Sequence, residues 1–191
     1  MNIVHALIAA AIGFIITFAL TWVLGFEDAP ENNVQTNNSV IERNEVYAPV
    51  SGTVVKLEDV NDKTFSEKIL GDGYAILPSE GTIVAPFDGV IKMIFTTGHA
   101  VGIVNDNGVE ILIHVGLDTV KLNGEHFEKC VSEGEHVIKG QPLIRFDRVA
   151  IEKLGYDLIT PIIVTNNDDH LEVIHSQMSK TRTNDVLFTV I

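Results

Sequence analysis

The sequence predicts an all-β domain: an antiparallel β-sandwich or barrel with duplicated hairpins and one short helix, preceded by one N-terminal transmembrane helix. Three observations predict it. The first 26 residues carry no Asp, Glu, Lys or Arg. Residues 45–191 hold short runs of Val, Ile and Thr broken by Gly, Pro, Asp and Asn. Within them, APVSGTVVKL from Ala48 and APFDGVIKMI from Ala85 repeat a pattern of strand, Pro-Gly turn and strand.

The N-terminal apolar stretch is long enough to cross a membrane. Residues 3–24 form a run of about 22 residues, which at ~1.5 Å per residue spans a ~30 Å hydrocarbon layer. A cleaved signal peptide is the alternative, but it requires Lys or Arg before the apolar core, and Met1 and Asn2 provide neither. Trp22 suits a membrane interface. We therefore expect residues 1–26 to be a transmembrane helix.

A polar segment separates this helix from the β-rich body. Residues 27–44 include EDAPENNVQTNNS, which is rich in Asn and acidic residues and almost free of large hydrophobic ones. Such a composition is typical of a flexible tether. The expected organisation is a helix at 1–26, a linker at 27–44 and a folded domain at 45–191.

One short helix is expected inside the β-rich body. Asp147 precedes RVAIEKL and can cap its first turn. Gly155 follows, where a left-handed residue commonly ends a helix.

The charge and cysteine content exclude several classes of function. The formal net charge is −13 at pH 7, and none of it lies in the apolar N-terminus. An acidic body of this kind is unsuited to nucleic acid, so we expect no nucleic-acid partner. The single cysteine, Cys130, excludes an intramolecular disulfide, and without a CxxC pair there is no zinc ribbon. We expect no metal and no cofactor.

Two histidines fall on either side of a predicted hairpin turn. In GHAVGIVNDNGVEILIHVG, residues 98–116, two β runs flank Asn-Asp-Asn-Gly. A turn centred on Asp106 and Asn107 pairs His99 with His114, whereas a turn one residue later pairs His99 with Gly116. Either register places both histidines on one face, with Cβ atoms roughly 5 to 8 Å apart.

Alternation along the second run separates a core face from an outer face. The residues predicted to face the core are Ile111, Ile113, Val115 and Leu117. The residues predicted to face outward are Glu110, Leu112, His114 and Gly116. His114 therefore lies beside a glycine that leaves room for an incoming group.

A histidine pair with a nearby hydroxyl suits phosphoryl transfer. A neutral imidazole nitrogen of His114 can attack phosphorus, while His99 and Thr97 stabilise charge on the phosphoryl oxygens. A zinc site would need more ligands than two histidines. An ATP-dependent kinase would need a P-loop, and GDGYAILPSEG lacks the Gly-Lys-Ser/Thr ending.

These segments resemble a known family. GVEILIHVGLDTV, TTGHAV, EKILGDGYAILP and VAPFDGVI are similar to the glucose-type enzyme IIA domain of the phosphoenolpyruvate:sugar phosphotransferase system. The resemblance covers about residues 46–191. LTWVLGFED resembles the end of the last membrane helix of an enzyme IIC domain, and GYDLITPIIVTN the IIA part of β-glucoside, sucrose and trehalose permeases. Because no IIB cysteine motif is present, the chain resembles the tail of such a permease.

The resemblance implies a role for each site residue. His114 would take the phosphoryl group from phospho-HPr, His99 would help pass it to a IIB domain, and Thr97 would support the pair by hydrogen bonding. The residues implied to contact partners are Phe65, Phe95, Leu112, Gly116, Asp118 and Val120. The implied location is the cell membrane, with the IIA domain in the cytoplasm and IIB and IIC domains as partners.

Two other functions use the same sequence features. EGEHVIKGQPLIRFD and APFDGVIKMI resemble the strand-turn patterns of biotinyl or lipoyl carrier modules. A carrier lysine belongs at a hairpin tip, however, and Lys92 lies inside an alternating run. The other alternative is a regulatory, membrane-tethered IIA domain that signals its phosphorylation state to other proteins.

Overall fold

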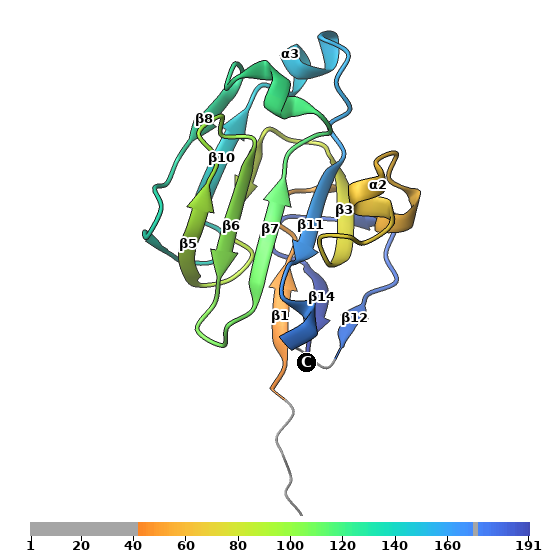
Figure 1. The fold of residues 1–191 in the computed structure, drawn as a ribbon, viewed down its shortest axis with the longest axis vertical. Coiled ribbons are helices and arrows are strands. Elements are labelled where there is room, and N and C mark those ends of the chain that lie inside the picture. The colour runs from red at the N-terminus through yellow and green to blue at the C-terminus, as the bar shows by residue number, and fades with distance from the viewer. Residues whose placement is uncertain (1–41, 170–171) are drawn as a thin grey trace, which may run out of the picture. The chain divides into compact units, whose positions relative to one another are not determined.

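Antiparallel strands in three sheets make up the described part of the chain, residues 42–169 and 172–191 of a computed structural model (Figure 1). The largest sheet has eight strands, in the order β13 (Lys180–Thr181), β2 (Gly52–Lys56), β3 (Asp72–Pro78), β11 (Thr160–Val164), β7 (Glu110–His114), β6 (Ala100–Val104), β5 (Gly89–Ile94) and β9 (His136–Val137). Two smaller sheets follow the orders β1 (Asn44–Tyr47), β14 (Val186–Val190), β12 (Val173–His175) and β4 (Thr82–Val84), β10 (Pro142–Phe146), β8 (Phe127–Lys129). The predicted all-β, antiparallel class is confirmed.

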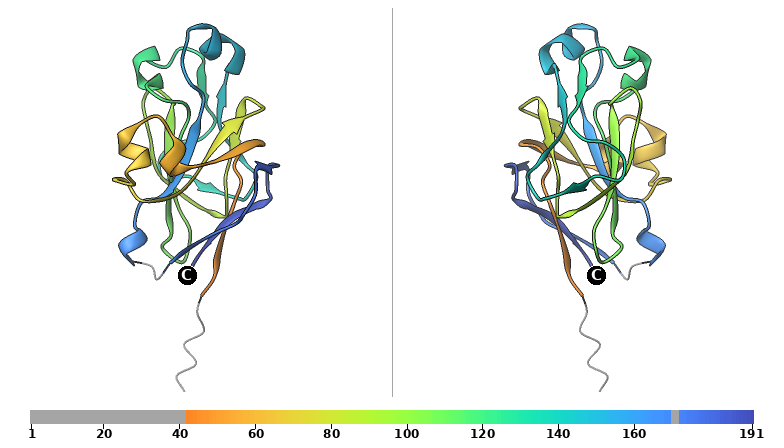
Figure 2. Two further views of the ribbon diagram at one scale, coloured as in Figure 1. Left: turned by 90° about the vertical axis from the view of Figure 1, so that its right-hand side faces the viewer. Right: turned by 90° about the vertical axis from the view of Figure 1, so that its left-hand side faces the viewer.

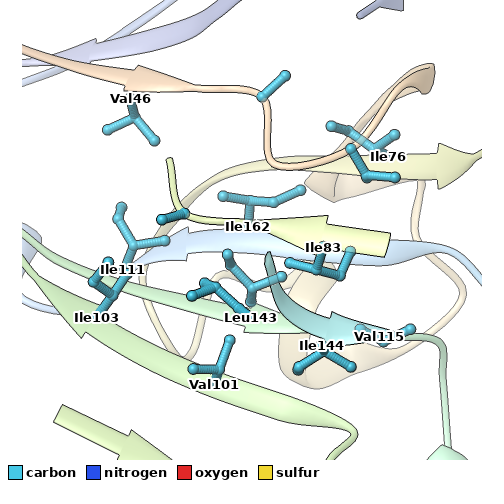
Figure 3. Packing of buried hydrophobic residues seen from close by; sticks show 14 of the residues in the cluster. Val46, Ile76, Ile83, Val101, Ile103, Ile111, Val115, Leu143, Ile144 and Ile162 are labelled. Atoms are coloured by element: carbon cyan, nitrogen blue, oxygen red, sulfur yellow. The ribbon is translucent and has the colours of Figure 1, made fainter. Parts of the chain in front are cut away.

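The core lies between the sheets. Val46 of β1, Leu143 of β10 and Ile162 of β11 come from three different sheets, and all are fully buried. Their side chains converge in the close view (Figure 3), and the side views show strands on both sides of this interior (Figure 2). β-Branched residues dominate because they pack well on pleated strands.

We expect Ile162→Ala to lower the free energy of unfolding by about 2–5 kcal/mol, because it leaves a cavity in a fully buried position of a central strand. Urea unfolding at constant pH measures the change. The matched control is Ile174→Ala in β12, where the side chain is 41% exposed. An equal loss of stability in both variants would contradict the central position of Ile162 in the core.

The repeated Ala-Pro segments do not form the duplicated hairpins that the sequence predicted. β1 pairs with β14 and β2 with β3, whereas β4 pairs with β10 and β5 with β6 and β9. Each Ala-Pro turn carries the chain from one sheet to another instead of reversing it. The two turns bond to each other: Tyr47 N donates to Pro86 O at 3.1 Å, and Val84 N donates to Pro49 O at 2.9 Å.

The duplication extends to the strands around these turns. Ala48 O accepts from Asn184 N at 3.0 Å, and Ala85 O accepts from Gly140 N at 2.9 Å. β13 pairs with β2 as β9 pairs with β5. The copy made of β4, β5, β9 and β10 is nested in the chain between β2 and β13 of the other copy. β6 and β7 are inserted between β5 and β9 of the nested copy.

The first and last strands meet at one edge of the body. In the β1–β14 pair, Asn44 lies opposite Val190. The buried Asn44 also accepts two side-chain hydrogen bonds at its Oδ1, from Asn105 at 3.1 Å and Asn107 at 2.7 Å. These two asparagines lie in the loop between β6 and β7, so the start of β1 is fixed to that loop.

The short helix α3 (Arg148–Lys153) confirms the predicted one. Asp147 Oδ1 accepts from Ala150 N at 3.0 Å, and Gly155 follows with φ +86°. Both terminal signals in the sequence thus act as expected.

A second helix, α2 (Lys63–Ser66), was not predicted. Asp62 caps it by accepting from Thr64 N at 2.8 Å. Four residues are too few to show a helical pattern of apolar positions, so only the capping residue could have indicated it. Within residues 42–169 and 172–191, the other helical segments are the 3₁₀ turns η1 (Leu57–Asp59), η2 (Thr119–Leu122) and η3 (Asn167–Asp169).

The predicted transmembrane helix at 1–26 lies outside the described residues, as does the linker up to residue 41. β1 begins at Asn44, the last residue assigned to that linker. In the part of the chain that the structure does describe, no helix is long and apolar enough to span a membrane.

Candidate active site

The hairpin that carries the two histidines has a different register from both predicted ones. β6 and β7 pair Ala100 with His114 and Val104 with Glu110, one residue away from either prediction. The loop between β6 and β7 is longer than the predicted two-residue turn, because the side chain of Asn105 accepts hydrogen bonds from backbone groups within it. Asn105 Oδ1 accepts from Asn107 N at 3.0 Å and from Val109 N at 2.8 Å.

The predicted proximity of the histidines is nevertheless confirmed. His99 lies just before β6, directly after Gly98 at φ +69°, so strand alternation does not dictate where its ring points. The backbone of His99 is still hydrogen-bonded to the segment that follows β7, since His99 O accepts from Val115 N at 2.8 Å. The rings of His99 and His114 meet edge to face, with centroids 4.8 Å apart.

Side chains along β7 point alternately into the core and outward, and this alternation ends at Gly116. Ile111, Ile113 and Val115 are buried in the core as predicted. The prediction for Leu117 is wrong: it packs against a second cluster that contains Phe65. The reason is Gly116, whose φ of +73° turns the chain and interrupts the period of two. On the outer face Glu110, Leu112 and His114 are half-buried, and Gly116 is buried.

A backbone carbonyl determines which nitrogen of His114 is free. Nδ1 lies 2.8 Å from the oxygen of Gly116. A carbonyl can only accept a hydrogen bond, so Nδ1 must carry the proton. In the neutral ring the lone pair is then on Nε2. The ring of Phe65, in α2, supports His114 at a centroid distance of 5.5 Å.

His99 is held by a hydroxyl and an aromatic ring. Thr97 Oγ1 lies 2.5 Å from His99 Nδ1, and the Phe95 ring lies 5.1 Å from the His99 ring. His99 is only 3% exposed. Burial, with a smaller effect of His114, lowers the pKa of His99 from 6.5 to about 4.

Burial also lowers the pKa of His114, although several groups oppose it. The bond to the Gly116 carbonyl and the charges of Asp62 and Asp118 favour the protonated ring. Both imidazoles are therefore neutral at pH 7, as a nucleophilic nitrogen requires. Asp62, the cap of α2, is a site residue that the sequence reading missed. Its position one residue before KTFSEKIL was the available signal.

We expect the free energy of unfolding to fall as the pH is lowered through the window from 6.5 to about 4. The lowered pKa of His99 means that the unfolded chain binds more protons in this window, so acid favours unfolding. His99 should contribute about 2 kcal/mol of this loss between pH 7 and pH 5.

Urea unfolding at the two pH values measures that contribution by comparing the wild type with His99→Asn, which should lose less stability on acidification. The matched control is His136→Asn, a change at an exposed histidine of β9. An unchanged pH dependence in His99→Asn would contradict the low pKa of His99.

The residues predicted to contact partners differ in exposure. Phe95 is 38% exposed and Val120 46%, whereas Phe65 is only 5% exposed. Phe65 thus packs against the His114 ring from inside the protein and offers little surface to a partner. Asp118 is exposed and pairs with Lys121 at 2.8 Å. Leu112 is half-buried and lines a groove together with Phe95.

Three further exposed apolar side chains were not predicted. Met93, beside Phe95 and Leu112 in the groove, is 41% exposed. Ile69 and Leu70, in the turn after α2, are 66% and 39% exposed. Apolar side chains that gather on a surface, as Met93, Phe95 and Leu112 do in this groove, are typical of a docking surface. Their positions in separate turns and strands left no local pattern in the sequence.

Lys92 and Cys130 have no special environment. Lys92 lies inside β5 and forms an ion pair with Glu110 of β7. It is therefore not at a hairpin tip, where a carrier lysine would lie. Cys130 is a free, half-exposed thiol. Within residues 42–169 and 172–191 no group of three or more His, Cys, Asp or Glu side chains is placed to hold a metal ion.

Comparison with known proteins assigns the chain to one family. The family model described as phosphoenolpyruvate-dependent sugar phosphotransferase system, EIIA 1, matches residues 44–170. The chain belongs to this family.

Two similar proteins are phosphotransferase system components that are much longer than this chain. The β-glucoside-specific EIIBCA component of Bacillus subtilis (strain 168) is 45% identical over 169 residues, which are 87% of this chain and 28% of that protein. The glucoside-specific EIICBA component of Staphylococcus carnosus (strain TM300) is 49% identical over 148 residues, 76% of this chain and 21% of that protein. The chain thus spans less than a third of the length of these relatives.

A solved structure shares the fold. Glucose permease IIA from Mycoplasma capricolum superposes with a TM-score of 0.70 at 37% sequence identity. The match covers 78% of this chain and 96% of that one.

Proposed function

We propose that the domain is a phosphocarrier of the sugar phosphotransferase system, which accepts a phosphoryl group on His114 from phospho-HPr and gives it to a cysteine of a IIB domain. The observation that carries the proposal is the contact between two imidazoles, one of which has Nδ1 bound to a carbonyl and Nε2 free. Membership of the EIIA family supports it.

The acceptance step uses the lone pair on His114 Nε2. A bond forms between Nε2 and phosphorus, the bond from phosphorus to the donor atom of phospho-HPr breaks, and the donor keeps its electron pair. The proton stays on Nδ1, so the phosphorylated ring carries a positive charge beside the Gly116 carbonyl. When the IIB thiolate attacks phosphorus, the ring leaves as a neutral imidazole and no proton has to move.

His99 and Thr97 have a supporting role in this scheme. If Thr97 donates its hydroxyl proton to His99 Nδ1, the proton of the neutral His99 ring lies on Nε2. That N–H can donate to a phosphoryl oxygen on His114, whose ring lies 4.8 Å away. A fixed donor aimed at developing charge lowers the barrier without reorganisation.

We call Phe95, which contacts His99, Met93, which shares a groove with Phe95, and Val120, in the turn after His114, the rim of the site. This rim suits brief contacts with two partners in turn. Phe95, Val120 and Met93 give it an exposed apolar surface, and Asp118 adds a charge beside it. Small apolar interfaces of this kind are typical of transient complexes. We propose that HPr and the IIB domain dock on this rim.

We further propose that the domain acts at the cell membrane, on the cytoplasmic side, as the tail of a permease with IIB and IIC domains. The names of the relatives, EIIBCA and EIICBA components, support this arrangement. The predicted transmembrane helix at 1–26 would provide the attachment.

The full chain in detergent, with phosphoenolpyruvate, enzyme I and HPr, tests the proposal. We expect one phosphoryl group per chain, acid-labile and alkali-stable as a phosphohistidine is, and dependent on HPr. A IIB domain added afterwards should discharge it. Labelling by ATP alone, or an acid-stable product, would contradict the proposed chemistry.

A further inference from the structure

One peptide group next to His114 is held at both of its ends. The carbonyl of Gly116 accepts from His114 Nδ1 at 2.8 Å. The N–H of the same peptide, that of Leu117, donates to the carbonyl oxygen of Asp157 at 2.8 Å. The peptide plane therefore cannot rotate without breaking a hydrogen bond, and its orientation determines where the acceptor for His114 lies.

Thr119 fixes the turn in which this peptide lies. It is fully buried, and its Oγ1 donates to the carbonyl of Val115 at 2.5 Å. Its Cγ2 lies 2.6 Å from the position that a Cβ would take at Gly116, so the methyl group covers that glycine closely. The side chain thus bonds the residue before Gly116 and packs against Gly116 itself, whose φ of +73° is available to few other residues.

The Asp157 end is fixed as well. Asp157 Oδ1 accepts from Ile159 N at 2.8 Å, which orders the approach to β11. Asp157 itself is exposed, so its side chain can be changed without disturbing the core. The proposed transfer scheme uses neither Thr119 nor Asp157 directly.

We propose that Thr119, together with the main chain of Asp157, positions His114 for phosphoryl transfer by holding the Gly116–Leu117 peptide whose carbonyl keeps the proton on Nδ1. Both are positioning residues, because they act through this peptide and do not touch the phosphoryl group. Consecutive hydrogen bonds polarise one another, so the bond to Asp157 makes the Gly116 carbonyl a better acceptor.

The chemical consequence concerns the tautomer of His114. If the peptide turned away, the proton could move to Nε2, and the attacking lone pair would be lost. In the phosphorylated state, loss of the Nδ1 proton would make the ring a poor leaving group. The rate consequence rests on the proposed function, whereas the tautomer itself does not.

The test is ¹⁵N NMR of the imidazole nitrogens at pH 8 in the full-length protein, with His114 assigned by comparison with His114→Ala. We expect the Nδ1–H tautomer to dominate in the wild type and in Thr119→Ser, which keeps the hydroxyl. Thr119→Val, nearly identical in shape, should shift the ring toward Nε2–H. Its rate of phosphorylation should fall by about fivefold to tenfold, the effect of one lost hydrogen bond.

A wild-type tautomer in folded Thr119→Val would overturn the proposal, and so would an equal shift in Thr119→Ser. If Thr119→Val does not fold, Asp157→Ala and Asp157→Asn test the same peptide from its other end. Asp157→Ala removes the acceptor for Ile159 N and should shift the tautomer, whereas Asp157→Asn retains it. An unchanged tautomer in Asp157→Ala would then overturn the proposal. No phosphoryl donor enters the NMR measurement, so failure of the wild type to accept phosphoryl affects the proposed function alone.

Discussion

His114→Ala should carry no phosphoryl group after incubation with phosphoenolpyruvate, enzyme I and HPr. The substitution removes the proposed nucleophile, and His99 cannot take its place. The ring of His99 is only 3% exposed, and the Nε2 proton that the proposed scheme gives it leaves no lone pair there. Incorporation of labelled phosphoryl per chain measures the effect, which should be a fall to the level obtained without HPr.

The matched control is His136→Ala, which removes an exposed imidazole from β9, away from the paired rings. It should be labelled as fully as the wild type. Wild-type labelling of His114→Ala would contradict the proposal that His114 is the phosphoryl acceptor. Loss of labelling in His136→Ala would indicate a different acceptor. Far-UV circular dichroism of each variant checks that the sheets have formed.

His99→Ala should accept phosphoryl but deliver it to the IIB domain about 10²–10³-fold more slowly, the usual effect of removing one donor that stabilises a transition state. Acceptance needs His99 less, because the Gly116 carbonyl alone sets the free nitrogen of His114. Delivery starts from the phosphorylated domain, in which the His99 N–H is the proposed donor to the oxygens.

Single-turnover mixing measures the two half-reactions separately, first with phospho-HPr and then, after removal of HPr, with a IIB domain. Thr97→Val is the informative companion, because it keeps the ring of His99 and removes only the hydroxyl bonded to Nδ1. It should slow delivery by less than His99→Ala does. Equal slowing of acceptance and delivery in His99→Ala would contradict the division of roles between the histidines.

The sequence was sufficient to predict the class of fold and the proximity of the two histidines, because a hairpin at this turn brings the start of β6 and the end of β7 together even when its register differs by one residue. Alternation along Ile111, Ile113 and Val115 follows directly from the pleat of a strand. Asp147 and Gly155 predicted the two ends of the short helix α3. The alternation along β7 and the ends of α3 are each encoded in a short local stretch of chain.

Features that depend on contacts between distant segments could not be predicted from local sequence pattern. The register of β6 and β7 shifted because Asn105 bonds two backbone groups of its own loop, and residues 105–109 lie between the paired positions instead of a two-residue turn. The pairing of β1 with β14 joins residues more than a hundred positions apart, so the Ala-Pro repeats looked like hairpins. Likewise, nothing in the sequence near Asp62 indicates that its charge favours the protonated form of His114 and so acts to raise the pKa of that ring.

The adjacency of Asn44 and Val190 has a consequence for how this unit can be combined with others. A body whose first and last strands lie side by side can be joined to a neighbour at either end, or inserted into one, without rearranging its interior. Asn44 is also fixed to the loop at the start of β7, whereas His114 is the last residue of that strand. A neighbour joined before Asn44 would therefore meet the body at the far end of β7 from the proposed nucleophile, so different modular orders are compatible with the proposed transfer site.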